Sequence, residues 1–116
     1  MISSSPKVGV IIPTYNPGES LRKCIEPMLE PTLKLRILVV DSSSTDGTFD
    51  LVRSMNIPVR VIPKNEFNHG GTRQNAITKL VDCDIVIFLT QDSIPKSSDV
   101  FIKIILLQPK FKFVRL

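Results

Sequence analysis

Three short apolar runs, each followed at once by a polar cluster, constrain the fold of this 116-residue chain more than any other feature. The runs are continuous and rich in Val and Ile. Such runs are typical of parallel strands that are buried on both faces, because helices cover the two sides of the sheet. The runs occupy residues 8–12, 37–40 and 85–89, and the clusters occupy residues 13–16, 41–47 and 90–93.

The polar clusters predict a ligand site. In an open α/β sheet the carboxyl ends of parallel strands meet at one edge, and ligands bind there. Three clusters that converge on this edge favour a nucleotide-type site over a bare scaffold. The sequence therefore predicts an α/β fold with an open, mostly parallel sheet and flanking helices.

Helical patterns separate the apolar runs. Pro27 lies within the first helical stripe and is expected to kink or shorten that helix. A second helix is expected to start near Ser44 or Thr45, and a third covers about 72–81, with a strand at 58–62 between them. The inward-facing residues expected of the first two helices are Leu21, Cys24, Ile25, Met28, Leu29, Phe49, Val52 and Met55.

The remaining chain continues the alternation of elements. A turn at residues 93–95 and a helix capped by Ser97 or Ser98 follow the third run, and residues 111–116 begin a strand-like alternation. The chain contains no internal repeat and no linker-like segment, so residues 1–116 are interpreted as a single domain.

Composition narrows the classes of function. The net charge of +4 suits a phosphate-bearing ligand or an anionic membrane surface. The basic residues are scattered rather than clustered, so nucleic acid is not an expected partner. Cys24 and Cys83 form no C-x-x-C pair and lie in apolar patterns, which predicts buried, reduced thiols and a cytoplasmic location. Peripheral association with the inner face of the membrane is compatible with the charge.

Two segments could have indicated secretion or membrane insertion, and neither does. Residues 1–6 lack the basic start and apolar stretch of a signal peptide. The apolar segment 100–107 is interrupted by Lys103 and is too short to span a bilayer, which takes about 20 residues.

The second polar cluster carries the clearest local chemistry. Asp41 ends its strand, so its carboxylate is expected to project over the sheet edge, where it could accept a hydrogen bond from a base N–H. Asp46 is expected in the first helical turn, where the helix dipole favours an acid. The alternative is that residues 44–46 only cap and charge a helix, and this alternative stays open for Asp46.

The third polar cluster is the candidate metal site. Asp92 follows an apolar run and is expected at the same edge, with Gln91 beside it. Mg²⁺ is typically held by one or two carboxylates together with substrate phosphate oxygens. Asp92 could therefore hold a divalent ion against a diphosphate. The alternative is an Asx turn ahead of the Ile94-Pro95 pair.

A glycine-rich segment at residues 70–75 offers a phosphate contact. Glycines allow close backbone approach, a helix amino terminus favours anions, and Arg73 can pair with phosphate through two hydrogen bonds. The segment has neither the Lys-Ser/Thr of a P-loop nor the spacing of a dinucleotide fingerprint. His69, the single histidine, is expected to form loop hydrogen bonds rather than to catalyse.

Taken in order, these motifs resemble the inverting glycosyltransferases of family 2, which have the Rossmann-like GT-A fold of nucleotide-diphospho-sugar transferases. The resemblance covers residues 8 to about 95. It includes Pro-x-Tyr-Asn at 13–16, Asp-x-Ser-x-Thr-Asp-Gly-Thr at 41–48 and the acid-bearing third cluster. Segments 41–48, 67–73 and 89–92 together are similar to the rhamnosyltransferase-like branch.

The resemblance implies a role for each matching residue. Thr14, Tyr15 and Asp41 would hold the nucleotide base, with Tyr15 packing on its ring. Asp46 would lie close to the nucleoside, and Arg73 would approach the diphosphate or position the acidic motif. The residues implied to bind the nucleotide sugar are Pro13, Thr14, Tyr15, Asn16, Asp41, Ser43, Asp46, Arg73, Gln91 and Asp92.

Two residues depart from the family pattern. Ser42 replaces the second acid of the commoner Asp-Asp-Gly-Ser motif. Gln91 replaces the first acid of the Asp-x-Asp or Asp-Asp metal motif, so that Asp92 alone would reach Mg²⁺ or Mn²⁺. With fewer carboxylates, the protein alone is not expected to bind a metal tightly. Binding of the metal together with the diphosphate remains compatible with the sequence.

The family also implies an acceptor half and a general base that follow the metal motif. No carboxylate follows Asp99 here, so no catalytic base is assigned and the chain is interpreted as a truncated, donor-binding half. The implied reaction transfers a sugar, with a lean to rhamnose, from a dTDP- or UDP-linked donor to a glycan or lipid-linked acceptor.

Two other classes of protein share this type of sheet. A catalytically incompetent nucleotide-binding module of the same fold remains open. A dehydrogenase is disfavoured, because residues 13–15 stand where its glycine fingerprint would follow the first strand.

The apolar residues of segment 101–113 lack a covering partner, which predicts a homodimer or a larger assembly.

Overall fold

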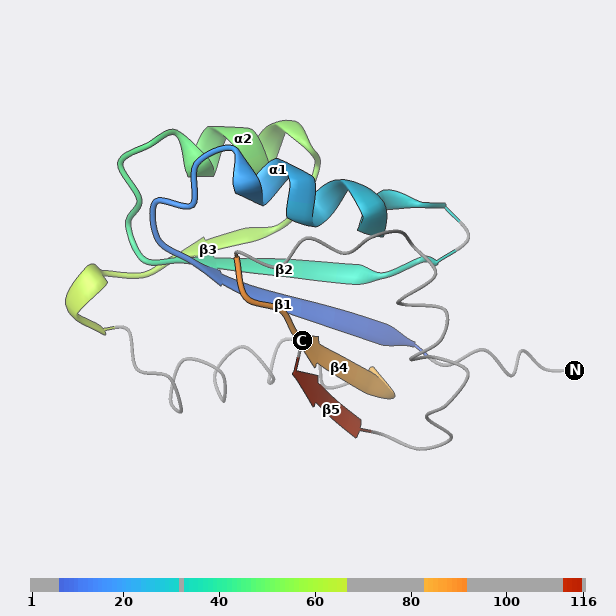
Figure 1. Ribbon diagram of the computed structural model, residues 1–116. Coiled ribbons are helices and arrows are strands. Elements are labelled where there is room, and N and C mark those ends of the chain that lie inside the picture. Colours follow the sequence, from blue (N-terminus) through green and yellow to red (C-terminus); the bar gives the residue numbers. More distant parts are fainter. Residues whose placement is uncertain (1–6, 32, 67–82, 92–111, 116) are drawn as a thin grey trace, which may run out of the picture.

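The computed structural model describes residues 7–31, 33–66, 83–91 and 112–115. These residues form a five-stranded sheet in the order β3-β2-β1-β4-β5, in which every neighbouring pair is parallel (Figure 1). The predicted open, parallel sheet is therefore confirmed. The strands are β1 (Val8–Thr14), β2 (Arg36–Asp41), β3 (Val59–Val61), β4 (Ile85–Phe88) and β5 (Lys112–Arg115).

The direction of strand progression reverses at β1. Strands β2 and β3 lie on one side of it, and β4 and β5 lie on the other. In open α/β sheets, ligands bind beyond the carboxyl ends of the strands at such a switch point. The β1–β2 register places Thr14 directly beside Asp41 at the carboxyl end. The second and first polar clusters are thus brought together by strand pairing itself.

One face of the sheet is covered by the helical segments α1 (Ser20–Ile25), η1 (Glu26–Leu29) and α2 (Thr48–Ser54) (Figure 1). Alternate strand residues pack with them in one core cluster. The other face is buried as well. Its cluster contains Ile11, Leu38, Val40, Cys83, Val86 and Phe88. Burial of both faces explains why the strands are continuous apolar runs rather than alternating ones.

Pro27 shortens the first helix, as predicted. The α-helix ends at Ile25, and the chain continues as a 3₁₀ turn with Pro27 near its start. The tighter 3₁₀ winding, with three residues per turn, also shifts the direction of the side chains that follow. Met28 is buried, but the prediction that Leu29 faces inward is wrong, because this side chain is 43% exposed.

The second helix begins later than predicted. It starts at Thr48 instead of Ser44 or Thr45, because its N-cap Gly47 has a left-handed φ of 88° that ends a preceding loop. Asp46 therefore precedes the helix and does not lie in its first turn. Val52 is buried, but Phe49 is 41% exposed and lies against Arg53, so its predicted inward orientation is wrong.

Some of the remaining predictions are confirmed, and others concern residues that the structure does not describe. Strand β5 confirms the strand-like pattern near the end of the chain, and Cys24 and Cys83 are buried thiols as expected. The expected helices over about 72–81 and after Ser97 or Ser98 lie outside the described residues. So do residues 101–111 of the apolar segment on which the assembly prediction rests, while residues 112 and 113 lie in β5. In the part of the chain that the structure describes, no helix has the length and apolar character to cross a membrane.

A pair of leucine substitutions tests the packing of the first helical segment. Leu21→Ala should lower the free energy of unfolding by about 2–5 kcal/mol, because Leu21 is fully buried under the sheet. Leu29→Ala removes the same atoms from an exposed position and should cost less than about 1 kcal/mol. Urea unfolding followed by circular dichroism measures both. Equal losses would contradict the burial assigned to Leu21 and Leu29.

Candidate functional site at the carboxyl edge

The carboxylate of Asp41 lies at the end of β2 and is buried, with only 1% of the residue exposed. The Thr14 hydroxyl donates to its Oδ1 at 2.6 Å. The Ser44 hydroxyl donates to the same oxygen at 2.5 Å, and the Ser44 N–H donates to Oδ2 at 2.8 Å. The carboxylate lies at the predicted edge of the sheet, and three donors of the chain converge on it. Its contact with a base stays a prediction.

The loop after β1 (residues 15–19) and the loop after β2 (residues 42–47) are joined by further hydrogen bonds, and we call them the paired loops. The Asn16 N–H donates to Ser44 Oγ at 2.8 Å, and the Thr45 N–H donates to Asn16 Oδ1 at 2.8 Å. The Ser42 N–H donates to the Thr14 carbonyl at 2.9 Å. Asn16 adopts a left-handed φ of 45°, which asparagine tolerates better than most residues. The two loops therefore form one unit.

Asp46 joins the paired loops to the start of α2. Its carboxylate accepts the Gly18 N–H at 2.9 Å, the Thr48 N–H at 3.2 Å and the Thr48 hydroxyl. The hydroxyl bond is the main reason that the pKa of Asp46 lies below its ordinary value, and the backbone N–H groups add to it. A capping role for Asp46 is thus present in the structure, together with a contact to the other loop.

Ser43 connects the paired loops to the neighbouring strand. Its hydroxyl donates to the Ile62 carbonyl at 2.7 Å, just beyond β3. Its φ of 60° is left-handed, which turns the chain away from β2 immediately after Asp41. The predicted nucleotide contact of Ser43 stays a prediction. In the structure its hydroxyl stabilises the loop.

Tyr15 presents a partly exposed ring at this edge. The residue is 40% exposed, and the Lys64 ammonium lies 4.6 Å from the ring centroid in a cation–π contact. Lys64 belongs to η2 (Lys64–Glu66), which follows β3. The sequence analysis missed this residue. Its position shortly after the carboxyl end of a predicted strand was the signal that could have identified it.

Gln91, three residues after the end of β4, contacts the backbone of Tyr15 through its side-chain amide. The Tyr15 N–H donates to Gln91 Oε1 at 2.7 Å, and Gln91 Nε2 donates to the Tyr15 carbonyl at 3.2 Å. The structure thus gathers most of the predicted site residues at one edge, while Arg73 and Asp92 lie outside the described residues. The gathered residues are Pro13, Thr14, Tyr15, Asn16, Asp41, Ser43, Asp46 and Gln91.

The described residues do not by themselves make a metal site. Within residues 7–31, 33–66 and 83–91, no group of three or more His, Cys, Asp or Glu side chains could hold an ion. The oxygens of Asp41 and Asp46 accept N–H and O–H donors of the chain, and Gln91 Oε1 accepts the Tyr15 N–H. A divalent ion held by Asp92 stays a prediction.

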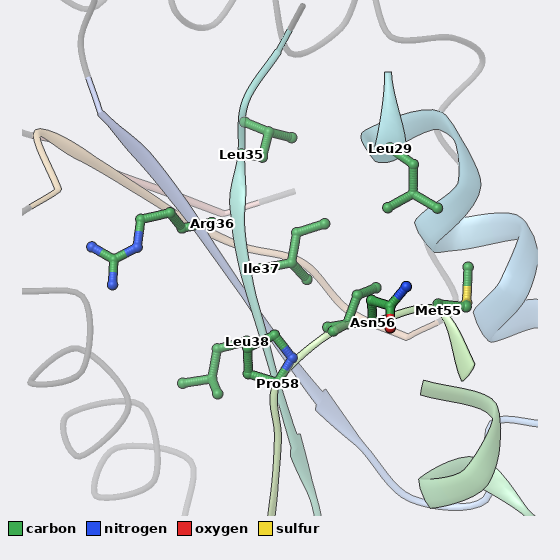
Figure 2. Close-up of a pocket in the computed structure, with 9 residues that line it drawn as sticks. Leu29, Leu35, Arg36, Ile37, Leu38, Met55, Asn56 and Pro58 are labelled. Carbon is green, nitrogen blue, oxygen red and sulfur yellow. The ribbon is translucent and has the colours of Figure 1, made fainter. Parts of the chain in front are cut away.

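An apolar cavity of about 370 Å³ lies at the opposite end of β2, between the ends of η1 and α2 (Figure 2). Leu29 and Ile37 point toward this space, while Arg36 points away from them. Because Arg36 and Ile37 begin β2 and Asp41 ends it, the cavity lies at the amino edge of the sheet. It is separate from the polar edge formed by the paired loops.

Comparison with known proteins gives this edge a family context. The model of the glycosyl transferase family 2 matches residues 9–104, a span that runs from the second residue of β1 through β4 and includes both paired loops. The chain belongs to this family. The resemblance inferred from the motifs is therefore confirmed.

Individual proteins with similar sequences support the same assignment. The chain is 41% identical over 95 residues to the O-antigen chain rhamnosyltransferase RfbN of Salmonella typhimurium, a match that covers 80% of this chain and 30% of RfbN. It is 37% identical over 94 residues to the O-antigen chain rhamnosyltransferase WbaN of Salmonella anatum, covering 77% of this chain and 29% of WbaN. The chain thus spans less than a third of the length of these relatives.

A solved structure confirms the GT-A fold. The mannosyltransferase PcManGT of Pyrobaculum calidifontis, solved in complex with GDP-Man and Mn²⁺, superimposes with a TM-score of 0.67 and 27% sequence identity. The superposition covers 90% of this chain and 33% of PcManGT.

The hydrogen bonds to Asp41 predict a stability effect. Asp41→Asn keeps the size of the side chain but turns an amide NH₂ toward donors, so the free energy of unfolding should fall by about 1–3 kcal/mol. Asp50→Asn is a control with the same charge change on the exposed surface of α2, and it should cost less than about 1 kcal/mol. Urea unfolding measures both variants. An Asp41→Asn variant as stable as the control would contradict the anchoring role.

The lowered pKa of Asp46 predicts a pH dependence of stability. Because the pKa is lower in the folded chain than in the unfolded chain, the ionised carboxylate stabilises the fold above the ordinary aspartate pKa of about 3.9. That stabilisation is lost as the pH falls through the folded pKa. Asp46→Asn should therefore lose less stability than the wild type between about pH 5 and about pH 3. Urea unfolding over this range would show parallel curves if the carboxylate contributed nothing.

Proposed function

We propose that this chain forms the donor-binding part of a glycosyltransferase that transfers a sugar from a nucleotide-diphosphate donor. The observation that carries the proposal is the pair of interlocked polar loops at the switch point of the sheet, within a family 2 match over residues 9–104. Loops at this position bind nucleotides in open α/β folds. Their mutual hydrogen bonds hold the polar groups in place before a ligand arrives, which lowers the ordering cost of binding.

The base of the nucleotide is proposed to bind between Tyr15 and Asp41. The exposed part of the Tyr15 ring offers a stacking surface. Asp41 Oδ2 accepts one N–H from the described residues, that of Ser44, so the oxygen has capacity for a second donor such as the N3–H of a pyrimidine. Because Asp41 is buried, a small movement of the paired loops must accompany that contact. This chemistry supports a dTDP- or UDP-linked donor.

The diphosphate is proposed to lie toward Arg73 and Asp92, with Mg²⁺ or Mn²⁺ held by Asp92 and phosphate oxygens. The Mn²⁺ named in the PcManGT complex supports a divalent ion in this fold. Such an ion would offset the negative charge that develops on the departing diphosphate. Lys64, near Tyr15, adds a positive charge at the same edge.

The sugar is proposed to be rhamnose and the acceptor a glycan or a lipid-linked acceptor. The support is the two rhamnosyltransferase relatives, at 41% and 37% identity, whose names refer to O-antigen chains.

A second candidate is a nucleotide-binding module that performs no transfer. Inverting transfer needs a base within hydrogen-bond reach of the acceptor hydroxyl. At this edge, Asp41 is buried and already accepts three hydrogen bonds from Thr14 and Ser44, and the lowered pKa of Asp46 makes it a weak base. These two carboxylates are therefore proposed to organise the binding edge and not to deprotonate an acceptor. Sugar transfer by the purified chain would exclude the second candidate.

Nucleotide titration by calorimetry tests the proposed function. UDP or dTDP should bind more tightly than ADP or NAD, because Asp41 recognises a pyrimidine N–H, and Mn²⁺ should raise the affinity. Asp92→Asn should abolish the gain from Mn²⁺ and leave metal-free binding nearly intact. Asp50→Asn, with the same charge change on α2, should keep the gain. Equal affinity for purine nucleotides would contradict the pyrimidine site, and a wild type indifferent to Mn²⁺ would remove Asp92 as a metal ligand.

A further inference from the structure

The side chain of Gln91 continues the pairing between β1 and β4 beyond the point where their backbones separate. The backbone pairing ends where the Leu89 N–H donates to the Ile11 carbonyl at 3.0 Å. Four residues after Ile11, just beyond the end of β1, the Gln91 amide accepts the Tyr15 N–H at 2.7 Å and donates to the Tyr15 carbonyl at 3.2 Å. One side-chain amide thus replaces a backbone partner and exchanges two hydrogen bonds with a single residue.

This exchange lies at the switch point, where β1 and β4 are adjacent but their connections diverge. Beyond the last backbone bond between β1 and β4, the Gln91 side chain contacts the chain after Thr14 on the β4 side. On its other side, Thr14 is fixed by Asp41. The Gln91 amide and the Asp41 carboxylate therefore hold the two sides of the segment that carries the Tyr15 ring.

An ionised acid of the same length could not make both of these bonds with Tyr15. A carboxylate could accept the Tyr15 N–H, but it has no proton to give to the Tyr15 carbonyl and would repel that oxygen. An acid at position 91 would therefore turn away from Tyr15. The family resemblance implies that an acid of the metal motif would stand at position 91. The glutamine amide is suited to holding Tyr15, whereas an acid would be suited to binding a metal.

We infer that Gln91 is a positioning residue that fixes Tyr15 at the switch point and presents its ring to the nucleotide base. The oxygen that an acid would offer to a metal accepts a backbone N–H of Tyr15 instead. Gln91 thus affects ligand affinity through Tyr15. The inference rests on the proposed function for the identity of the ligand, while the link between Gln91 and Tyr15 stands on geometry alone.

The chain contains a natural probe of this link. Tyr15 is its single tyrosine, and it has no tryptophan, so the tyrosine band of the near-ultraviolet circular dichroism spectrum reports on Tyr15 alone. Gln91→Glu tests the need for an amide donor. Gln91→Met keeps the length of the side chain and removes both hydrogen bonds without adding charge. Asn56→Asp is the control, since it makes the same amide-to-acid change at the exposed amino edge beside the cavity.

The ligand-free proteins test the positioning itself. The Tyr15 band should weaken in Gln91→Glu and in Gln91→Met, and it should keep its wild-type intensity in Asn56→Asp. Thermal unfolding identifies which variants are folded, and Gln91→Met serves if the charged variant is not. A Tyr15 band unchanged in the folded Gln91 variants would overturn the inference.

Nucleotide titration separates positioning from metal ligation. Loss of Tyr15 positioning should weaken UDP or dTDP binding about tenfold in both Gln91 variants, by a similar factor with and without Mn²⁺. If position 91 belonged to the metal site, Gln91→Glu would instead increase the gain in affinity from Mn²⁺, and that result would overturn the inference. If the wild type binds no nucleotide, the proposed function fails, while the Tyr15 band still decides whether Gln91 positions Tyr15.

Discussion

The buried carboxylate of Asp41 is the interaction on which the polar edge of this protein depends. A charge with 1% exposure is tolerated only when hydrogen bonds replace its lost water. Thr14 supplies one donor from β1, and Ser44 supplies two from the loop after β2. Ser44 in turn accepts the Asn16 N–H. The need to satisfy one buried charge therefore sets the relative position of two loops that are distant in the sequence.

Three segments that are far apart along the chain meet around Tyr15. Gln91 contacts its backbone from the end of β4, and Lys64 contacts its ring from η2. The paired loops complete the edge on the side of β2. Most polar groups here have partners within the chain, so the edge is assembled before any ligand binds. If this edge is the proposed donor site, the arrangement favours a site that is preformed over one that is ordered by its donor.

The sequence by itself determined the strands, their parallel arrangement and the edge at which the polar clusters lie. The physical reason is that a continuous run such as residues 85–89 can bury both of its faces only in a covered parallel sheet. Pro27 likewise predicted the shortening of α1, because a proline in a helix interior lacks the N–H that the helix needs. The motifs at 13–16 and 41–48 were sufficient to predict the family.

The tertiary structure alone decided which partners the site residues contact. Asp41 was predicted at the right edge but without its partners, because no local pattern shows that Thr14 and Ser44 both donate to it. The late start of α2 depends on the left-handed Gly47, and the pairing of Gln91 with Tyr15 links residues 76 positions apart. Such contacts arise from strand order and register. Local sequence specifies which residues end a strand, but the neighbouring strands determine which partners those residues meet.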